Sequence, residues 1–152
     1  MYLILFYIFI VVGFSKESQD SKIIDLIMKG EYELLSNNPE NAKFYFEKIL
    51  DIDSSSASIY LSLSEINLIQ NDLLTYSKSL SRAFELDRSN LEVGIMCANA
   101  YIINGQLNKA ESHLLNLNEL FPNNNEINFT LIELYKISNE WLKLINLNLK
   151  LF

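Results

Sequence analysis

The sequence predicts an all-α fold in which pairs of helices repeat along the chain. Three observations lead to this prediction. Between the turns, apolar residues follow helical spacing, as Ile24, Ile27 and Met28 do. Turns rich in Asn, Ser, Gly and Pro recur, and equivalent turns lie 34 residues apart. No segment shows the sustained alternation of apolar and polar residues that is typical of a half-buried strand.

The 34-residue period divides most of the chain into four units that align without a gap. A single unit cannot bury its apolar faces alone, so neighbouring units are expected to stack. The expected organisation is a leader at 1–15, a linker at 16–22, and a repeat domain at 23–152 with units 23–56, 57–90, 91–124 and 125–152.

Polar residues and proline predict where the helices within the units begin. Pro39 follows Asn38 and suits the first turn of a helix. Asp72 after Asn71, and Asn125 followed by Glu126, are typical of helix N-termini.

The third unit matches a known repeat pattern best. It has small residues at positions 8 and 20, an aromatic at 11, Gly in the turn, Leu at 24 and Pro at 32: Ala98, Ala110, Tyr101, Gly105, Leu114 and Pro122. This period and these residues resemble the tetratricopeptide repeat (TPR) family. The resemblance implies a right-handed superhelical α-solenoid that acts as a non-catalytic binding or scaffold module. Three large residues depart from the pattern and are expected to widen helix crossings locally: Tyr76, Ile132 and Leu144.

The resemblance also implies a concave groove lined by the first helix of each unit. The expected peptide-binding residues are Glu31, Leu34, Leu61, Glu65, Leu68, Ile95, Asn99, Ile102, Phe129, Glu133 and Lys136. An apolar floor crossed by carboxylates favours a peptide or helix with apolar anchors and basic flanks. Lys136 is the single cation of this set, which argues against the carboxylate clamp of chaperone-binding members. The alternative is that these side chains belong to the core, to a packed leader or to a solvated face.

The first 14 residues contain 13 apolar side chains, and no charged side chain precedes Lys16. This run is shorter than a comfortable membrane span and fits the core of a secretory signal. We therefore expect an exported protein, periplasmic or secreted, that assembles cell-envelope or secretory-route complexes. An uncleaved membrane anchor or a buried helix are the alternatives.

The segment 141–152 has more apolar residues than one buried helix face needs. We expect an exposed apolar edge that pairs with a second copy, a partner or a membrane, or that is covered by further repeats. An alternative function is therefore a membrane-anchored regulatory or structural subunit that oligomerises through this helix.

Composition excludes several other function classes. The formal net charge of −7 argues against nucleic-acid binding. One Cys and one His leave no expected metal site, and no phosphate-binding loop or catalytic constellation is present, so neither a cofactor nor enzymatic activity is expected. Cys97 is expected in the core and His113 on the surface or between helices.

Overall fold

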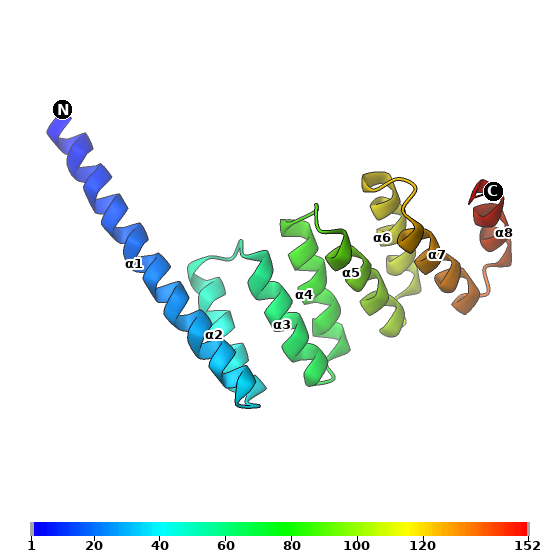
Figure 1. Ribbon diagram of the computed structural model, residues 1–152, viewed down its shortest axis with the longest axis horizontal. Coiled ribbons are helices and arrows are strands. Elements are labelled where there is room, and N and C mark those ends of the chain that lie inside the picture. Colours follow the sequence, from blue (N-terminus) through cyan, green and yellow to red (C-terminus); the bar gives the residue numbers. More distant parts are fainter. Residues whose placement is uncertain (1, 152) are drawn as a thin grey trace. The chain divides into compact units, whose positions relative to one another are not determined.

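In the computed structural model, residues 2–151 are described, with side chains described from 18 to 149. Within this range the chain forms eight α-helices and no strand, which confirms the predicted all-α fold (Figure 1). The helices are α1 (Tyr2–Leu35), α2 (Pro39–Ile52), α3 (Ala57–Ile69), α4 (Leu73–Leu86), α5 (Leu91–Ile103), α6 (Leu107–Leu120), α7 (Asn125–Ile137) and α8 (Trp141–Leu151).

The helix boundaries repeat with the period seen in the sequence. The first helices α3, α5 and α7 begin at residues 57, 91 and 125, which are the first residues of the expected units. The second helices α2, α4, α6 and α8 begin at residues 39, 73, 107 and 141. The chain divides into two compact units, which we call the N-terminal unit (up to Ile59) and the C-terminal unit (from Tyr60), and each is described by itself.

Helix α1 is longer than the other first helices and corrects one expectation. The stretch 16–22, expected as a linker, lies inside α1. This stretch contains neither Pro nor Gly, so nothing in it interrupts helical hydrogen bonding. The side chains of the expected leader at 1–15 lie outside the described residues. In the described part of the chain, no helix is both long and apolar enough to cross a membrane.

Each first helix ends in the same left-handed turn. At Gly105, φ is +71°, its N–H donates to the Ile102 carbonyl at 3.0 Å, and the Gln106 N–H donates to the Tyr101 carbonyl at 2.8 Å. These two bonds satisfy carbonyls that the end of the helix leaves unpaired. The same pair of bonds and a φ near +60° recur at the three equivalent residues, Asn37, Asn71 and Asn139. The repeat is therefore present in the backbone as well as in the side chains.

Three later helices begin with a capping side chain. Asp72 accepts from the Thr75 N–H at 3.0 Å, and Asn90 accepts from the Val93 N–H at 3.1 Å. Asn124 caps α7 by accepting from the Ile127 N–H at 3.2 Å, and α7 begins at Asn125, as the sequence predicts. Each bond satisfies an amide that the first turn leaves without a partner.

In the N-terminal unit, a glycine allows α1 and α2 to pack closely. A Cβ atom at Gly30 would lie 2.8 Å from Cε1 of Phe46, which is fully buried. Ala42 and Ile49 of α2 are buried beside this contact. The small residue at position 8 of the first unit therefore makes room for a large residue at position 24.

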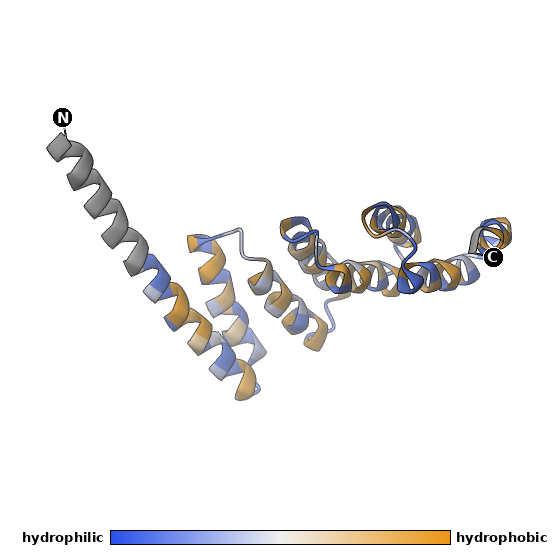
Figure 2. Cartoon of the chain, turned by 45° about the horizontal axis from the view of Figure 1, so that its top comes forward, coloured by the Kyte–Doolittle hydropathy of each residue, from blue (hydrophilic) through white to orange (hydrophobic). Residues whose placement is uncertain are grey.

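In the C-terminal unit, α4 to α8 contribute to one continuous hydrophobic core. Its fully buried members include Leu80, Leu114 and Ile127. Hydrophobic (orange) and hydrophilic (blue) residues occur together along the helices of this unit (Figure 2). Tyr76, which departs from the small residue expected at position 20, is buried in this core.

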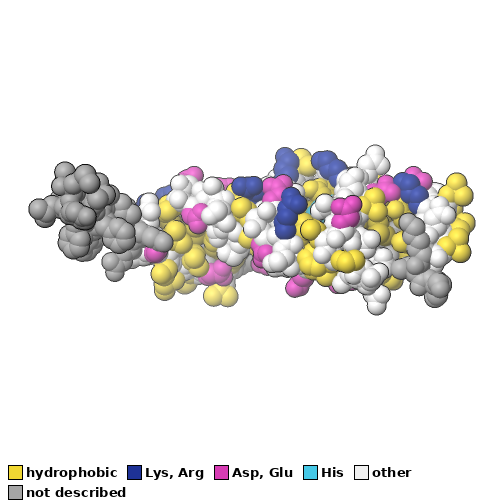
Figure 3. Space-filling model, turned by 90° about the horizontal axis from the view of Figure 1, so that it is seen from above, with side chains coloured by type: hydrophobic (Ala, Val, Ile, Leu, Met, Phe, Trp, Pro, Cys, Tyr) yellow, Lys and Arg dark blue, Asp and Glu magenta, His cyan; other side chains and the backbone are white. Residues whose placement is uncertain are grey.

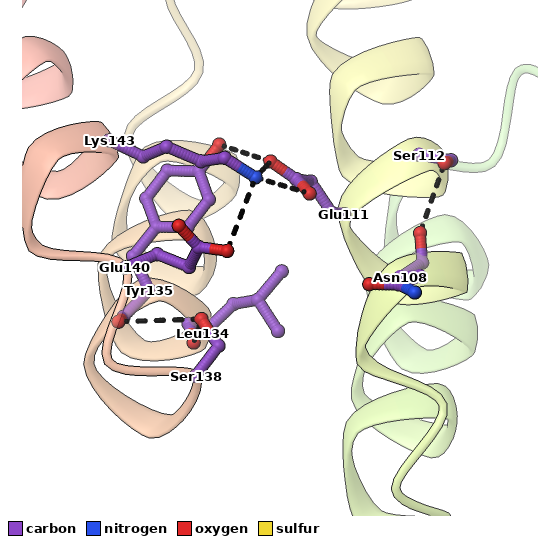
Figure 4. A network of polar contacts seen from close by, with 8 residues as sticks. All are labelled: Asn108, Glu111, Ser112, Leu134, Tyr135, Ser138, Glu140 and Lys143. Carbon is purple, nitrogen blue, oxygen red and sulfur yellow. Dashed lines mark hydrogen bonds and ion pairs between the residues drawn. The ribbon is translucent and has the colours of Figure 1, made fainter.

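Helix α8 packs on the core through Leu144 and Leu147. A polar network also holds it: Lys143 Nζ lies 2.8 Å and 2.9 Å from the two carboxylate oxygens of Glu111, and the Tyr135 hydroxyl donates to the same carboxylate at 3.1 Å (Figure 4). An apolar edge is exposed as expected, but Leu144 and Leu147 do not belong to it. Its described residues are Trp141, Leu142, Ile145 and Leu149.

Candidate partner-binding surface

Most of the expected groove residues lie at equivalent positions on α3, α5 and α7. Positions 5, 9, 12 and 13 of each unit fall on one side of a helix because successive residues are about 100° apart. Helices α5 and α7 pack against each other within the C-terminal unit, so these sides lie next to one another. We call this the first-helix face.

Two large apolar side chains stand out from the first-helix face. Leu68 of α3 is 48% exposed and Phe129 of α7 is 63% exposed. Glu65, Asn99 and Lys136 are also exposed. The remaining expected residues are half-buried: Leu61, Ile102 and Glu133.

Ile95 corrects the expected groove. It is only 5% exposed and belongs to the hydrophobic core, so it cannot contact a partner. Helix α5 packs against α4, α6 and α7, whereas α7 packs against α5, α6 and α8. Position 5 is buried on α5 and open on α7.

The charges on this face are weaker than the sequence indicates. Lys136 Nζ lies 2.8 Å from the Glu133 carboxylate, so these two residues largely cancel each other's charge. Glu65 has no ion pair among the described residues. Within the C-terminal unit, Glu65 is therefore the uncompensated carboxylate of the first-helix face.

The other two expected residues belong to α1 in the N-terminal unit. Glu31 is exposed and Leu34 is half-buried. A separate apolar stripe runs along α1 through side chains spaced four, four and three residues apart. It consists of Ile24, Met28, Tyr32 and Leu35, all of them exposed.

Position 13 adds exposed apolar residues to the first-helix face. Ile69, Ile103 and Ile137 occupy this position on α3, α5 and α7, and each is more than half exposed. The sequence alone does not distinguish a core position from an exposed one for these three residues. Their place in the last turn of a first helix, next to the left-handed cap, keeps them outside it.

His113 and Cys97 have structural environments. His113 Nε2 donates to the Gly94 carbonyl at 2.9 Å, and burial lowers the pKa of the imidazole. Cys97 is fully buried, and this burial raises the pKa of its thiol to about 11. Both side chains are therefore neutral at pH 7, and Cys97 is shielded from reagents. No group of three or more potential metal ligands occurs within the described residues.

No protein-family model and no curated protein matches this sequence. Solved structures do match. The second TPR domain of human RPAP3, in complex with an HSP70 peptide, has 18% identity and a TM-score of 0.60, over 76% of this chain and 97% of that chain. MamA has 18% identity and a TM-score of 0.66, over 86% of this chain and 74% of that chain. YrrB, a TPR protein with an unusual peptide-binding site, has 19% identity and a TM-score of 0.64, over 88% of this chain and 70% of that chain.

These similarities cover more than three quarters of the chain and coincide with the 34-residue period of its helices and caps. At such low identities they establish the architecture and not the partner. The chain has the fold of tetratricopeptide repeat domains.

Proposed function

We propose that this protein is a non-catalytic interaction module that binds a peptide or helix on the first-helix face of its C-terminal unit. The observation that carries the proposal is the exposure of Leu68 on α3 and Phe129 on α7, together with the uncompensated carboxylate of Glu65, which lies three residues before Leu68 on the same helix. Large exposed apolar side chains combined with a localised charge are typical of partner surfaces.

The partner that fits this face has two or more apolar anchors and a Lys or Arg flank. Burial of the exposed parts of Leu68 and Phe129 contributes about 1 kcal/mol or more for each side chain. Because association itself costs several kcal/mol, further contacts along the face must complete the complex. Glu65 attracts a basic flank, and the Asn99 amide can both donate to and accept from the backbone of a bound peptide. The peptide complexes of RPAP3 and the peptide-binding site of YrrB support peptide binding by this fold.

A peptide library displayed on phage tests this proposal without a known partner. Selection on the full chain should enrich peptides that combine bulky apolar residues with Lys or Arg. Exchange of Leu68 and Phe129 for Ser should abolish the enrichment. The same exchange at Leu115 and Leu120, which are exposed apolar residues of α6, is the matched control and should leave it intact. Enrichment that survives the first pair of substitutions would contradict the proposal.

The cellular setting is a further part of this proposal. The apolar leader at 1–15 supports export or membrane tethering, and a scaffold in such a compartment would assemble envelope or secretory complexes. Cell fractionation followed by N-terminal sequencing of the mature chain distinguishes the two forms. A soluble intracellular chain with an intact leader would contradict both.

The exposed edge of α8 favours a second candidate function, which is self-association. Trp141, Leu142, Ile145 and Leu149 lie within about 100° of one another around α8, on the side opposite its packed residues. The proposed occupant is the apolar stripe of α1 in a second copy, since that stripe is equally uncovered. Sedimentation should show association at micromolar concentration that Ile145→Lys removes. A monomer at these concentrations would contradict this candidate.

A further inference from the structure

A cluster of cations lies on the second-helix side of the C-terminal unit, away from the first-helix face. Lys78 and Arg82 come from α4, Arg88 from the turn after α4, and Lys109 from α6. In a chain whose net charge is −7, the 32 residues from Lys78 to Lys109 contain four cations and three carboxylates. Figure 3 shows Lys and Arg side chains (dark blue) close together on part of the surface in view.

These cations line two adjoining depressions. The first, of about 290 Å³, is lined by Lys78, Arg82 and Lys109 together with the polar side chains of Ser77, Ser81 and Gln106. The second, of about 500 Å³, is lined by Arg88, Lys109 and His113. Tyr101 and Lys109 line both depressions, so the two form one continuous surface. We call it the basic surface.

Most of the positive charge of the basic surface is uncompensated. Arg82 pairs with Glu85 at 3.0 Å, and Glu85 is the one carboxylate that lines either depression. Lys78, Arg88 and Lys109 make no ion pair with any carboxylate of the described residues. Lys109 instead lies over the ring of Tyr101, at 5.9 Å from its centroid. The surface is thus positively charged at pH 7 and has a polar and aromatic floor.

We propose that the basic surface binds an acidic peptide segment of a partner protein. The cations come from three separate elements and extend over two depressions, so a ligand must carry negative charges at several points along its length. An extended chain with spaced Asp or Glu residues meets this requirement, whereas a single small anion would contact only part of the surface. The hydroxyl of Ser81 and the amide of Gln106, which are both partly exposed, can hydrogen-bond to its backbone. This site is independent of the first-helix face, which favours basic flanks.

Fluorescence anisotropy with a labelled decapeptide of alternating Glu and Ala tests the proposal on the full chain. Charge reversal of Lys78 and Lys109 to Glu should weaken binding by about tenfold or more, because both depressions lose their shared cation and gain a repulsive charge. The matched control reverses Lys22 and Lys48, two exposed lysines of the N-terminal unit, which changes the net charge equally. Its affinity should remain within about twofold of wild type because neither Lys22 nor Lys48 lines either depression.

Three outcomes would overturn the proposal: the Glu–Ala peptide shows no measurable binding to the wild-type chain, the Lys78 and Lys109 double variant binds it with unchanged affinity, or the control variant loses as much affinity as the double variant. Displacement of the peptide by millimolar inorganic phosphate, beyond the effect of sodium chloride at equal ionic strength, would assign the surface to a small anion instead. Circular dichroism of both variants verifies that these exposed substitutions leave the helices intact.

Discussion

The left-handed turn at Gly105 allows the repeat architecture to be tested by a single substitution. A Cβ atom at this residue would meet no other atom within 4 Å, so Gly105→Ala introduces no steric clash. The residue has φ of +71°, however, a conformation that costs an L-residue about 1–2 kcal/mol. Ala also restricts the unfolded chain, which offsets about 0.4–1 kcal/mol of this cost. We expect a net destabilisation of about 1 kcal/mol.

Asn is the informative control because Asn37, Asn71 and Asn139 occupy the equivalent turns. Asn tolerates the left-handed region better than Ala does, so Gly105→Asn should cost less than about 0.5 kcal/mol. Urea denaturation followed by circular dichroism measures both variants. With an m-value of about 2 kcal/mol/M, the midpoint of the Ala variant should fall by about 0.5 M.

Two results would refute this reasoning. In the first, Gly105→Ala is as stable as wild type, so that the turn imposes no conformational demand. In the second, Gly105→Asn lowers the free energy of unfolding as much as Gly105→Ala does, so that the turn at Gly105 differs from the three turns that contain Asn. A changed m-value would indicate that the repeats no longer unfold together, in which case hydrogen exchange around α5 gives the local comparison.

Three further predictions concern buried and bridging side chains. Burial lowers the pKa of His113 below its ordinary value of 6.5, so the unfolded state binds more protons than the folded state as the pH falls through 6.5. The free energy of unfolding should therefore drop between pH 7.5 and 5.5. In urea titrations, His113→Gln should reduce this drop. A drop of equal size in the variant would contradict the assignment. Cys97 should react with a thiol reagent only after denaturation, and stoichiometric labelling of the native chain would show that the core is open. Glu111→Gln should speed amide hydrogen exchange in α8 relative to α6, because the substitution removes the charge that holds Lys143. Unchanged exchange would show that the packing of Leu144 and Leu147 is sufficient to hold α8 in place.

The sequence was sufficient to predict the fold because its signals are local. Turn residues such as Gly105 mark the ends of helices wherever the chain lies, and their spacing shows the period without knowledge of packing. The stretch 16–22, expected as a linker, is helical because it contains neither Pro nor Gly to interrupt the helix. Polar residues alone do not end a helix.

The candidate surface could be predicted only in part because exposure depends on neighbouring helices. Ile95 and Phe129 occupy the same repeat position, yet one is buried and the other exposed. No local pattern distinguishes them, since the difference arises from which helices pack against α5 and α7. The pairing of Glu133 with Lys136 could be predicted from the sequence, because residues three apart on a helix are neighbours on its surface. The basic surface could not be predicted from the sequence, because its cations come from three elements that only the fold brings together.

The central claim, that partners bind on the first-helix face, is tested most directly by isothermal titration calorimetry. A peptide selected on the wild-type chain is titrated into wild type, into the Leu68→Ser and Phe129→Ser double variant, and into the Leu115→Ser and Leu120→Ser control. The account predicts a loss of affinity of about 30-fold or more in the first variant and less than about twofold in the control, since burial of each apolar anchor contributes about 1 kcal/mol or more. Equal affinities for all three proteins would contradict it.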